Sequence, residues 1–485
     1  MARKFLFLVV ALAIAALLGA PYIFGGQAQQ LHRSYADKLT AAGSTSLKES
    51  DFSRGWFRSS ARDVIELCST AGGCKELVIS SVLHHGPIAI TGIMDGVAPL
   101  APVQAVMVST VRFGDLAADA KLQPELPNLT VTTVAQMDGS SRGTVSMPPS
   151  THTAESKDGK NTLALGGVDG SFAGTANSPR IQGDVTLRSF KLEDAAGMAL
   201  GINGVNTTFS GEGTEVGFIG TVDEKIDSIT MASTANDPQP LEIKGLKISL
   251  NGSRSSDGLS QTRFNADIQT IASGGRAYGP AKLEGETLRV NRAALTRMQK
   301  ELEALEAEKK PPEEMMPAMM GIYQKNLGEV LKSRPELNLK SVSVKAPEGE
   351  LLSSLKLVAV PPPGELNMGA WLQMLQSEFS LQIPAATLWN ILDAQLQKAA
   401  QQAALQSGQP PVVPTQDEIG AKVTELVNAN IFVPKLDANA YTLQVAFLEG
   451  RLLVNGQENQ GFATLGAFMK SQPAPPPVET TPPAP

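Results

Sequence analysis

The stretch Leu246-Lys247-Ile248-Ser249-Leu250, followed by Asn251-Gly252, decides the fold class. Its apolar side chains alternate with polar ones, which is the period of a strand that buries one face and exposes the other. An Asn-Gly pair is a strong hairpin signal, so the sequence predicts a turn at 251–252. The same alternation predicts further strands at 131–134, 144–147, 181–187 and 226–231.

Turn-forming pairs separate these runs, and short strands joined by such pairs indicate antiparallel hairpins. The segment 31–290 is therefore expected to form a large meandering sheet with one solvated face. Glycine eases bends and bulges, so the Gly-rich stretch 166–220 favours a strongly twisted or curved sheet. The predicted turn pairs are Asp138-Gly139, Asp158-Gly159, Asn203-Gly204 and Asp257-Gly258.

The period of the pattern changes at Ala293, where apolar residues begin to recur every three or four positions. That spacing is typical of an amphipathic helix, here 293–309. Helices are also expected at 313–333, 367–377, 384–400 and 415–430, the last opened by a capping box from Thr415 to Glu418. Strands are expected at 337–345 and 351–360, and a hairpin at 441–454 that turns at Glu449-Gly450.

The fold class expected from these patterns is α+β. The expected architecture is an N-terminal transmembrane helix followed by an elongated, mostly antiparallel curved β-sheet body, with several helices in the C-terminal half.

Composition excludes several function classes. The 485 residues are 42% hydrophobic, which is enough apolar surface for a sizeable core. A net charge of −7 without a basic cluster argues against nucleic-acid binding. With four His and two Cys, the usual zinc spacings cannot be assembled, and neither GxSxG nor a Walker A loop is present. The sequence therefore predicts no enzyme, no metal site and no cofactor.

The N-terminus carries an export signal. Arg3 and Lys4 precede the uncharged segment Phe5–Gly26, which as a helix would be about 33 Å long and could cross a bilayer. The flanking charges predict that the rest of the chain lies outside the cytoplasm. The alternative is a signal peptide cleaved after Ala28; we favour the uncleaved anchor because the apolar run is long for a signal peptide.

Export gives the two cysteines a context. Cys68 and Cys74 bracket a short loop that contains Gly72-Gly73. In an oxidising compartment we expect a local disulfide that closes a hairpin. The alternative is two free thiols.

Two further motifs are candidates for function. His84-His85-Gly86-Pro87 follows the expected strand 77–83, and we expect its rings to pack or hydrogen-bond locally, because no other ligand or catalytic cluster has a recognisable spacing. In the segment 54–59, Trp56 and Phe57 are expected to point to opposite faces, so that one enters the core. A contact with a partner or a lipid headgroup is the alternative.

The N-terminal anchor and four motifs, taken in their order and spacing, resemble the YdgA-like family of uncharacterised bacterial envelope proteins, over roughly residues 3–469. The motifs are Arg54-Gly55-Trp56-Phe57-Arg58-Ser59, His85-Gly86-Pro87, Tyr278-Gly279-Pro280-Ala281-Lys282-Leu283, and the closing segment 450–457 with its Asn455-Gly456. The resemblance implies an inner-membrane protein that faces the periplasm of a Gram-negative bacterium. It brings no catalytic residues, and the positions Arg54, Gly55, Trp56, Phe57, His85, Gly86, Pro87, Asn455 and Gly456 are expected to be structural.

These inferences give a domain division and two functional hypotheses. The division is a membrane anchor at 1–29, a β-rich periplasmic region at 30–292, a mixed region at 293–470 that continues the same sheet, and a disordered Pro-rich tail at 471–485. The first hypothesis is a non-enzymatic envelope protein, held at the inner membrane by its N-terminal helix, that binds lipid or another apolar component in a β-sheet groove. The alternative is a structural protein that self-associates or contacts other envelope proteins.

Overall fold

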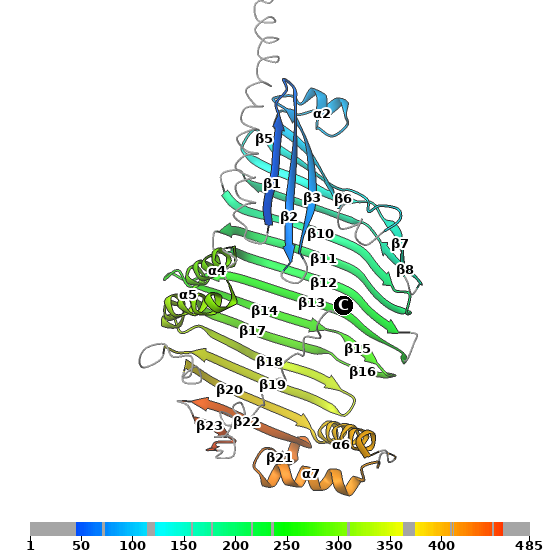
Figure 1. Ribbon diagram of the computed structural model, residues 1–485, viewed down its shortest axis with the longest axis vertical. Helices are drawn as coiled ribbons and strands as arrows, with labels where there is room; N and C mark the ends of the chain where they lie inside the picture. Colours follow the sequence, from blue (N-terminus) through cyan, green and yellow to red (C-terminus); the bar gives the residue numbers. More distant parts are fainter. Residues whose placement is uncertain are drawn as a thin grey trace, which may run out of the picture. The chain divides into compact units, whose positions relative to one another are not determined.

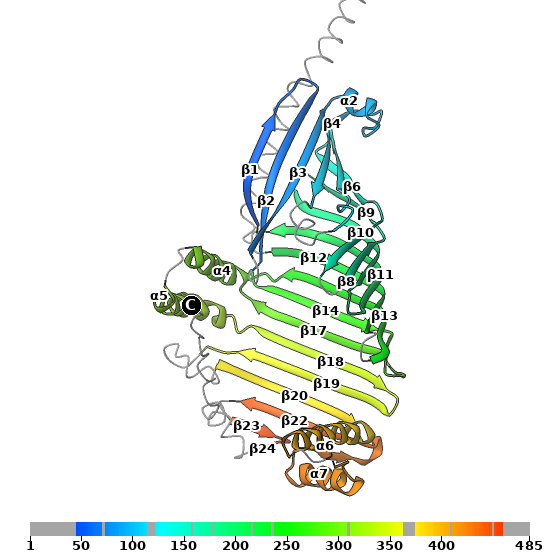
Figure 2. The same ribbon diagram turned by 45° about the vertical axis from the view of Figure 1, so that its right-hand side comes forward.

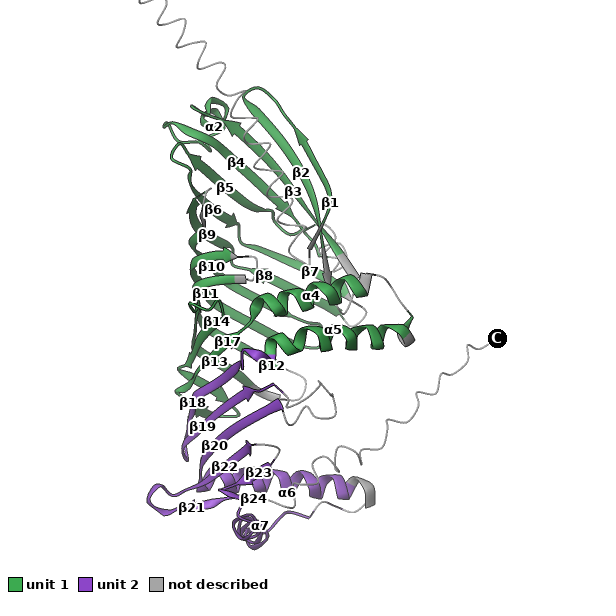
Figure 3. Cartoon of the chain, turned by 90° about the vertical axis from the view of Figure 1, so that its left-hand side faces the viewer, with its two compact units in different colours: residues 1–330 green, residues 331–485 purple. Residues whose placement is uncertain are grey.

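The computed structural model describes residues 45–69, 73–113, 122–156, 159–175, 178–214, 217–233, 237–307, 311–361, 374–407, 410, 412–448 and 451–458 (Figure 1). Of the described residues, 60% are in strands and 21% in helices. It divides into two compact units, residues 1–330 and 331–485 (Figure 3). The strand pairs among the described residues are antiparallel.

The first unit is built on one ladder of strands that largely follow one another in the chain. The order across the ladder is β1-β2-β3-β4-β5-β6-β9-β10-β11-β12-β13-β14-β17. The hairpin β7–β8 pairs with one end of β10, and β15–β16 pairs with one end of β13. The strands are β1 (Thr45–Ser53), β2 (Arg58–Ser69), β3 (Gly73–His85), β4 (Val103–Arg112), β5 (Leu129–Gln136), β6 (Ser140–Met147), β7 (Ser150–Ser156), β8 (Gly159–Leu165), β9 (Val168–Thr175), β10 (Ser178–Glu193), β11 (Met198–Thr214), β12 (Gly217–Ser233), β13 (Asp237–Arg254), β14 (Ser260–Ile268), β15 (Thr270–Ser273), β16 (Arg276–Tyr278) and β17 (Ala281–Val290).

The middle strands are unusually long. β10 to β13 have 16 to 18 residues each, against a usual strand of about five or six. All four expected strands at 131–134, 144–147, 181–187 and 226–231 lie inside β5, β6, β10 and β12, so these predictions are confirmed. Alternation identified the strands correctly but underestimated their length.

Two of the predicted turns are wrong. Asn251-Gly252 lies inside β13 and Asn203-Gly204 lies inside β11. Asn251 pairs with Thr221 on one side and Arg263 on the other, so ladder hydrogen bonds from two neighbours outweigh a local turn preference. Gly204 keeps a left-handed φ of 64°, which remains as a local irregularity within the strand.

The other turn pairs behave differently. Asp138-Gly139 joins β5 to β6 and Asp257-Gly258 joins β13 to β14, with φ of 82° and 80° at the glycines, so these two predictions are confirmed. Gly159 begins β8, while Asp158 lies outside the described residues. The confirmed turns occur where consecutive strands already pair with each other.

Strands β2, β3 and β4 and helix α2 (Ile90–Met94) meet at one end of the first unit (Figure 2), and two small buried clusters lie among them. Ala61 and Leu83 form one buried cluster with Phe52 and Met107 packed against it. A second cluster is formed by Ala89, Val103 and Val106, with Val97, Ala98 and Val134 packed around them.

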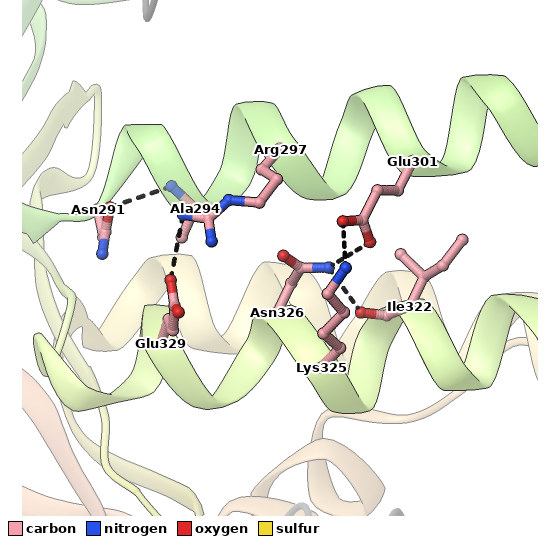
Figure 4. Close-up of polar contacts among 8 residues, drawn as sticks. All are labelled: Asn291, Ala294, Arg297, Glu301, Ile322, Lys325, Asn326 and Glu329. Carbon is pink, nitrogen blue, oxygen red and sulfur yellow. Dashed lines mark hydrogen bonds and ion pairs between the residues drawn. The ribbon is translucent and has the colours of Figure 1, made fainter.

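The first unit ends in a helical hairpin of α4 (Arg292–Ala307) and α5 (Pro312–Lys332), whose last residues pass into the second unit. Polar contacts join the two helices (Figure 4). The buried Asn326 amide donates to Glu301 at 2.9 Å, and Lys325 donates to the same carboxylate at 2.7 Å. Arg297 lies 3.2 Å from Glu329. The Lys325 and Asn326 hydrogen bonds lower the pKa of Glu301.

The second unit is a smaller antiparallel ladder, β18-β19-β20-β22-β23-β24, with β21 paired to one end of β22. Helices α6 and α7 pack on it and enclose a core of Ile383, Leu388, Leu392, Ile419 and Val423. The elements are β18 (Glu336–Ala346), β19 (Gly349–Ala359), β20 (Leu375–Pro384), α6 (Ala385–Ser407), α7 (Gln416–Asn428), β21 (Val433–Lys435), a 3-10 turn (Leu436–Ala438), β22 (Ala440–Leu448), β23 (Arg451–Val454) and β24 (Gln457–Glu458).

Most of the helices expected in the C-terminal half are present. Those predicted at 293–309, 313–333, 384–400 and 415–430 correspond to α4, α5, α6 and α7. The capping box is confirmed, since the Thr415 hydroxyl accepts from the Glu418 N–H and the Glu418 carboxylate accepts from the Thr415 N–H. The helix expected at 367–377 is wrong where it can be checked, because Leu375 begins β20.

The expected α+β class is wrong. Strand exceeds helix almost threefold, and the helices are additions to antiparallel ladders rather than a comparable layer. No helix in the described ranges combines the length and the apolar character needed to span a bilayer. The expected transmembrane segment Phe5–Gly26 and the Pro-rich tail lie outside the described residues.

Candidate functional site

The candidate site is one face of the first unit's sheet, formed where β6 and β9 to β13 lie side by side. Residues directly opposite each other in an antiparallel pair share a face, so the register identifies rows that cross the strands. One row is entirely apolar and crosses six strands. It consists of Met147, Val168, Leu187, Val205, Ile226 and Leu246, and we call it the apolar row.

A second row on the same face combines phenylalanine with glycine. Gly143, Phe172, Gly183 and Phe209 stand opposite one another in successive strands, and Val222 continues the row. A Cβ atom placed on Gly143 would lie 2.2 Å from Cζ of Phe172, and one on Gly183 would lie 2.7 Å from Cζ of Phe209. Each ring therefore leans over the glycine of the neighbouring strand, and these glycines provide the space it occupies.

The two rows lie four residues apart along each strand, with one row of the same face between them. That middle row is mostly apolar, with Val145, Val185 and Ile248, and is interrupted by Thr207 and Glu224. We call the three rows together the apolar face. Its large side chains are only partly buried, and Leu250, which follows Val222 in the phenylalanine row, is 39% exposed.

The opposite face of the same strands is polar. Thr144, Ser171, Asp184 and Thr208 stand in register there, and the Ser171 hydroxyl donates to Asp184 at 2.5 Å. A hollow of about 670 Å³ is lined mainly by residues of this polar face. The sheet is therefore amphipathic, and its hollow lies on the polar side.

The histidine motif forms a separate, buried polar cluster, which we call the histidine hub. Ser59 and His85 are both almost fully buried, with the Ser59 Oγ 3.0 Å from His85 Nε2. His85 Nδ1 lies 3.1 Å from the Trp56 carbonyl oxygen, which can only accept a hydrogen bond. Nδ1 therefore donates to this carbonyl, and the Ser59 hydroxyl is the hydrogen-bond partner of Nε2.

The neighbouring histidine ties helix α2 to the same hub. His84 Nδ1 lies 2.9 Å from the Thr91 hydroxyl, which in turn donates to the Phe57 carbonyl at 3.4 Å. Burial lowers the pKa of His84, against the opposing effect of Asp95, whose carboxylate is 3.9 Å from Nε2. The hub thus joins the β1–β2 loop, the end of β3 and α2 into one ordered region.

The hub brings together two motifs that lie apart in the sequence. Arg54, Gly55, Trp56 and Phe57 form the loop before β2, and backbone bonds to β4 hold the turn at Gly86 and Pro87. The Gly86 N–H donates to Gln104, the Pro87 carbonyl accepts from Val103, and a Cβ on Gly86 would lie 1.8 Å from the Val103 carbonyl.

The outcome for the two aromatics is divided. Phe57 is half-buried, but Trp56 is 52% exposed, so the indole does not enter the core.

The closing motif has a local structural role in the second unit. Asn455 has a left-handed φ of 46° in the turn between β23 and β24, followed by Gly456 at 78°. The Asn455 amide donates to the Asn430 and Ile431 carbonyls, and its oxygen accepts from the Gln444 N–H. These bonds fix the end of α7 against β22.

The two cysteines stand directly opposite each other across the β2–β3 ladder. The Cα separation of such pairs, about 4.5–5.5 Å, is within the range that a disulfide needs. The disulfide itself stays a prediction. Among the described residues, no cluster of three or more His, Cys, Asp or Glu is placed to hold a metal ion.

Sequence reasoning missed Ser59 as the partner of His85 and did not identify the apolar face by its residues. The residues of each row come from six different strands, so the row exists only once the register is known. The one sequence signal was the placement of Phe and Gly at alternate positions, as in Phe172 and Gly170, which indicates rings that lie against glycine on a neighbouring strand.

Comparison with known proteins identifies the family. The model of a bacterial protein family of unknown function, DUF945, matches residues 3–460, and the chain belongs to this family. No curated protein and no solved structure matches the chain.

Proposed function

For this member of the DUF945 family, we propose a non-enzymatic role: the apolar face of the first unit binds lipid acyl chains or another apolar component of the bacterial envelope. We also propose that the protein acts at the inner membrane with most of its chain in the periplasm, and that it is YdgA-like. The N-terminal charge pattern and the order of the four motifs support these two points.

The observation that carries the proposal is the apolar row. Apolar side chains on a folded sheet are normally covered by another layer, yet all six of these remain partly exposed. Neighbouring strands lie about 4.8 Å apart, so six strands present a stripe about 24 Å wide. One leaflet of a bilayer is about 15 Å deep in its hydrocarbon region, so the stripe can accommodate a fully extended acyl chain.

The energetics favour such a ligand. Each buried CH₂ group contributes about 0.8 kcal/mol, and the phenyl rings of Phe172 and Phe209 add flat contact area beside the row. The threonine and serine side chains of the opposite, polar face remain in water. Glu224 lies on the apolar face, and its carboxylate is the group there that would contact a lipid headgroup or its counter-ion.

The test is the lipid content of the purified full chain. We expect mass spectrometry of an organic extract to find a lipid in stoichiometric amount. Val205→Glu should reduce the amount of bound lipid at least tenfold. A tenfold change corresponds to about 1.4 kcal/mol, which is less than the contribution of two buried CH₂ groups. Val205→Thr, which keeps the shape, should reduce it less.

Thr208→Glu is the matched control, because it places the same charge on the same strand but on the polar face. It should leave the lipid unchanged. Equal loss in both glutamate variants would show a folding defect instead of a lost contact. A lipid-free wild type that forms dimers disrupted by Val205→Glu would assign the face to a protein partner, the structural alternative.

A further inference from the structure

We infer that one end of the first unit is a second, peripheral membrane contact, which inserts side chains into the interface of an anionic lipid bilayer. This end consists of residues 54–58 and 86–102, and we call it the tip. The inference is independent of lipid binding on the apolar face and of an N-terminal anchor. Its evidence is the exposure, order and charge of the tip.

Large hydrophobic side chains are concentrated at the tip. Trp56 is 52% exposed, Ile90 44%, Met94 81% and Leu100 89%, and Ile88 is also exposed. Single exposed apolar residues are ordinary, but five of the 18 exposed large ones in the described part of the chain fall within these two short segments. A cluster of this kind marks a surface that meets something apolar.

Hydrogen bonds order the backbone of the tip in the absence of a membrane. The Phe57 carbonyl accepts from the His85 N–H at 3.0 Å and from Thr91, which joins the β1–β2 loop to α2. Within the second segment, the Gly92 carbonyl accepts from the Val97 N–H at 2.8 Å, and Gly92 is buried against the His84 ring. A surface that is already ordered loses little conformational entropy on binding.

The chemistry of the tip favours a bilayer over a protein partner. Tryptophan concentrates at membrane interfaces, where its ring sits among headgroups, and aliphatic side chains beside it reach the acyl boundary. Arg54 and Arg58 are exposed at the same end, and Asp95, 3.7 Å from Arg58, is the one acidic residue in the two segments. The tip is thus locally positive in a chain with a net charge of −7, which matches anionic headgroups.

The experiment uses the full chain reconstituted into vesicles of phosphatidylcholine and phosphatidylglycerol, with or without bromine on the acyl chains. Bromine quenches only those indoles that reach the hydrocarbon boundary. We expect brominated lipid to quench wild-type fluorescence. Trp56→Phe should remove that quenching while leaving emission from the chain's other tryptophans, Trp371 and Trp389.

Two further variants separate the tip from other membrane contacts. Replacing both Met94 and Leu100 by glutamate should reduce the quenching of Trp56 at least fivefold. Leu436→Glu is the matched control, because Leu436 is 91% exposed in the second unit, and it should change nothing. Vesicles without phosphatidylglycerol should show weaker quenching.

The result that overturns the inference is a wild-type chain that is retained in the vesicles but whose quenching is the same as that of Trp56→Phe. The inference also fails if the Met94 and Leu100 variant leaves Trp56 quenching unchanged while its circular dichroism shows an intact fold. Retention in the vesicles is scored separately, so a membrane anchor elsewhere cannot be mistaken for contact by the tip.

Discussion

Helices α6 and α7 bury apolar side chains at one end of the ladder in the second unit. Among the described residues, the large side chains of the apolar face of the first unit are not buried to the same extent. Between α6, α7 and the ladder, Ile383 of β20 and Leu388 of α6 are each 4% exposed. On the apolar face of the first unit, side chains of the same kind, such as Leu187 and Val205, remain partly exposed. Apolar strand residues such as Ile383 and Val205 therefore reach different degrees of burial. Burial depends on what packs against the strand, and the strand's own sequence does not encode it.

The largest expected effect on stability comes from truncating one apolar side chain to alanine in each of the two units. Leu388→Ala should lower the free energy of unfolding of the second unit by about 2–5 kcal/mol, because it leaves a cavity in a closed core. Val205→Ala should cost about 1 kcal/mol or less in the first unit, since the wild-type side chain is already partly in water. Hydrogen exchange resolved by unit measures both. Equal losses would mean that the apolar face is covered as tightly as the core.

The next effect tests whether the first unit is held by its polar hub instead of its apolar face. His85→Ala leaves the buried Ser59 hydroxyl and the Trp56 carbonyl without this partner, and should cost about 1–3 kcal/mol. Urea denaturation followed by hydrogen exchange in β2 and β3 measures it. Leu100→Ala, at the exposed surface of the same region, is the control and should be close to neutral. A neutral His85→Ala would mean that the hub does not stabilise the first unit.

The smallest expected effect is a difference in pH dependence: the histidine hub and the helical hairpin should lose stability over different pH ranges. Burial lowers the pKa of His84, so the unfolded chain binds this proton more readily and the hub loses stability as pH falls from about 6.5 through the lowered folded pKa. Glu301 also has a lowered pKa, because Lys325 and Asn326 bind its carboxylate. Its contribution is present at neutral pH and is lost only as pH falls below the ordinary glutamate range.

Hydrogen exchange of the full chain over a series of acidic pH values checks this order. Amides of α2 should gain exchange first, and those of α4 and α5 later. His84→Gln should flatten the response of α2 and leave the hairpin unchanged. A response of α2 that persists in His84→Gln would assign the pH dependence to another group.

Strand identity could be predicted from the sequence, but strand ends and pairing could not. The alternation at 131–134 and 226–231 placed both segments correctly in strands, and Asp257-Gly258 was recognised as a turn. Asn251-Gly252 has the same local preference, yet it lies between two partner strands that offer ladder hydrogen bonds. Local propensity decides only where the tertiary pairing leaves the choice open.

The sites show the same limit. The motif around His85 was recognisable, but its contact with Ser59 joins positions 26 residues apart and depends on the β2–β3 register. The exposure of Trp56 follows from its place in a loop that the hub holds outward, which no alternation pattern describes. The apolar row needed the register of six strands before its members could be grouped.

The consecutive pairing of β10 to β13 also constrains how a chain of this kind can change in length. Each strand reverses the direction of the one before it, so inserting a single strand would make the rest of the chain leave from the opposite ends of the strands. A whole hairpin can be added or lost without that reversal. The width of the apolar row is therefore adjustable only in steps of two strands, or about 9.6 Å.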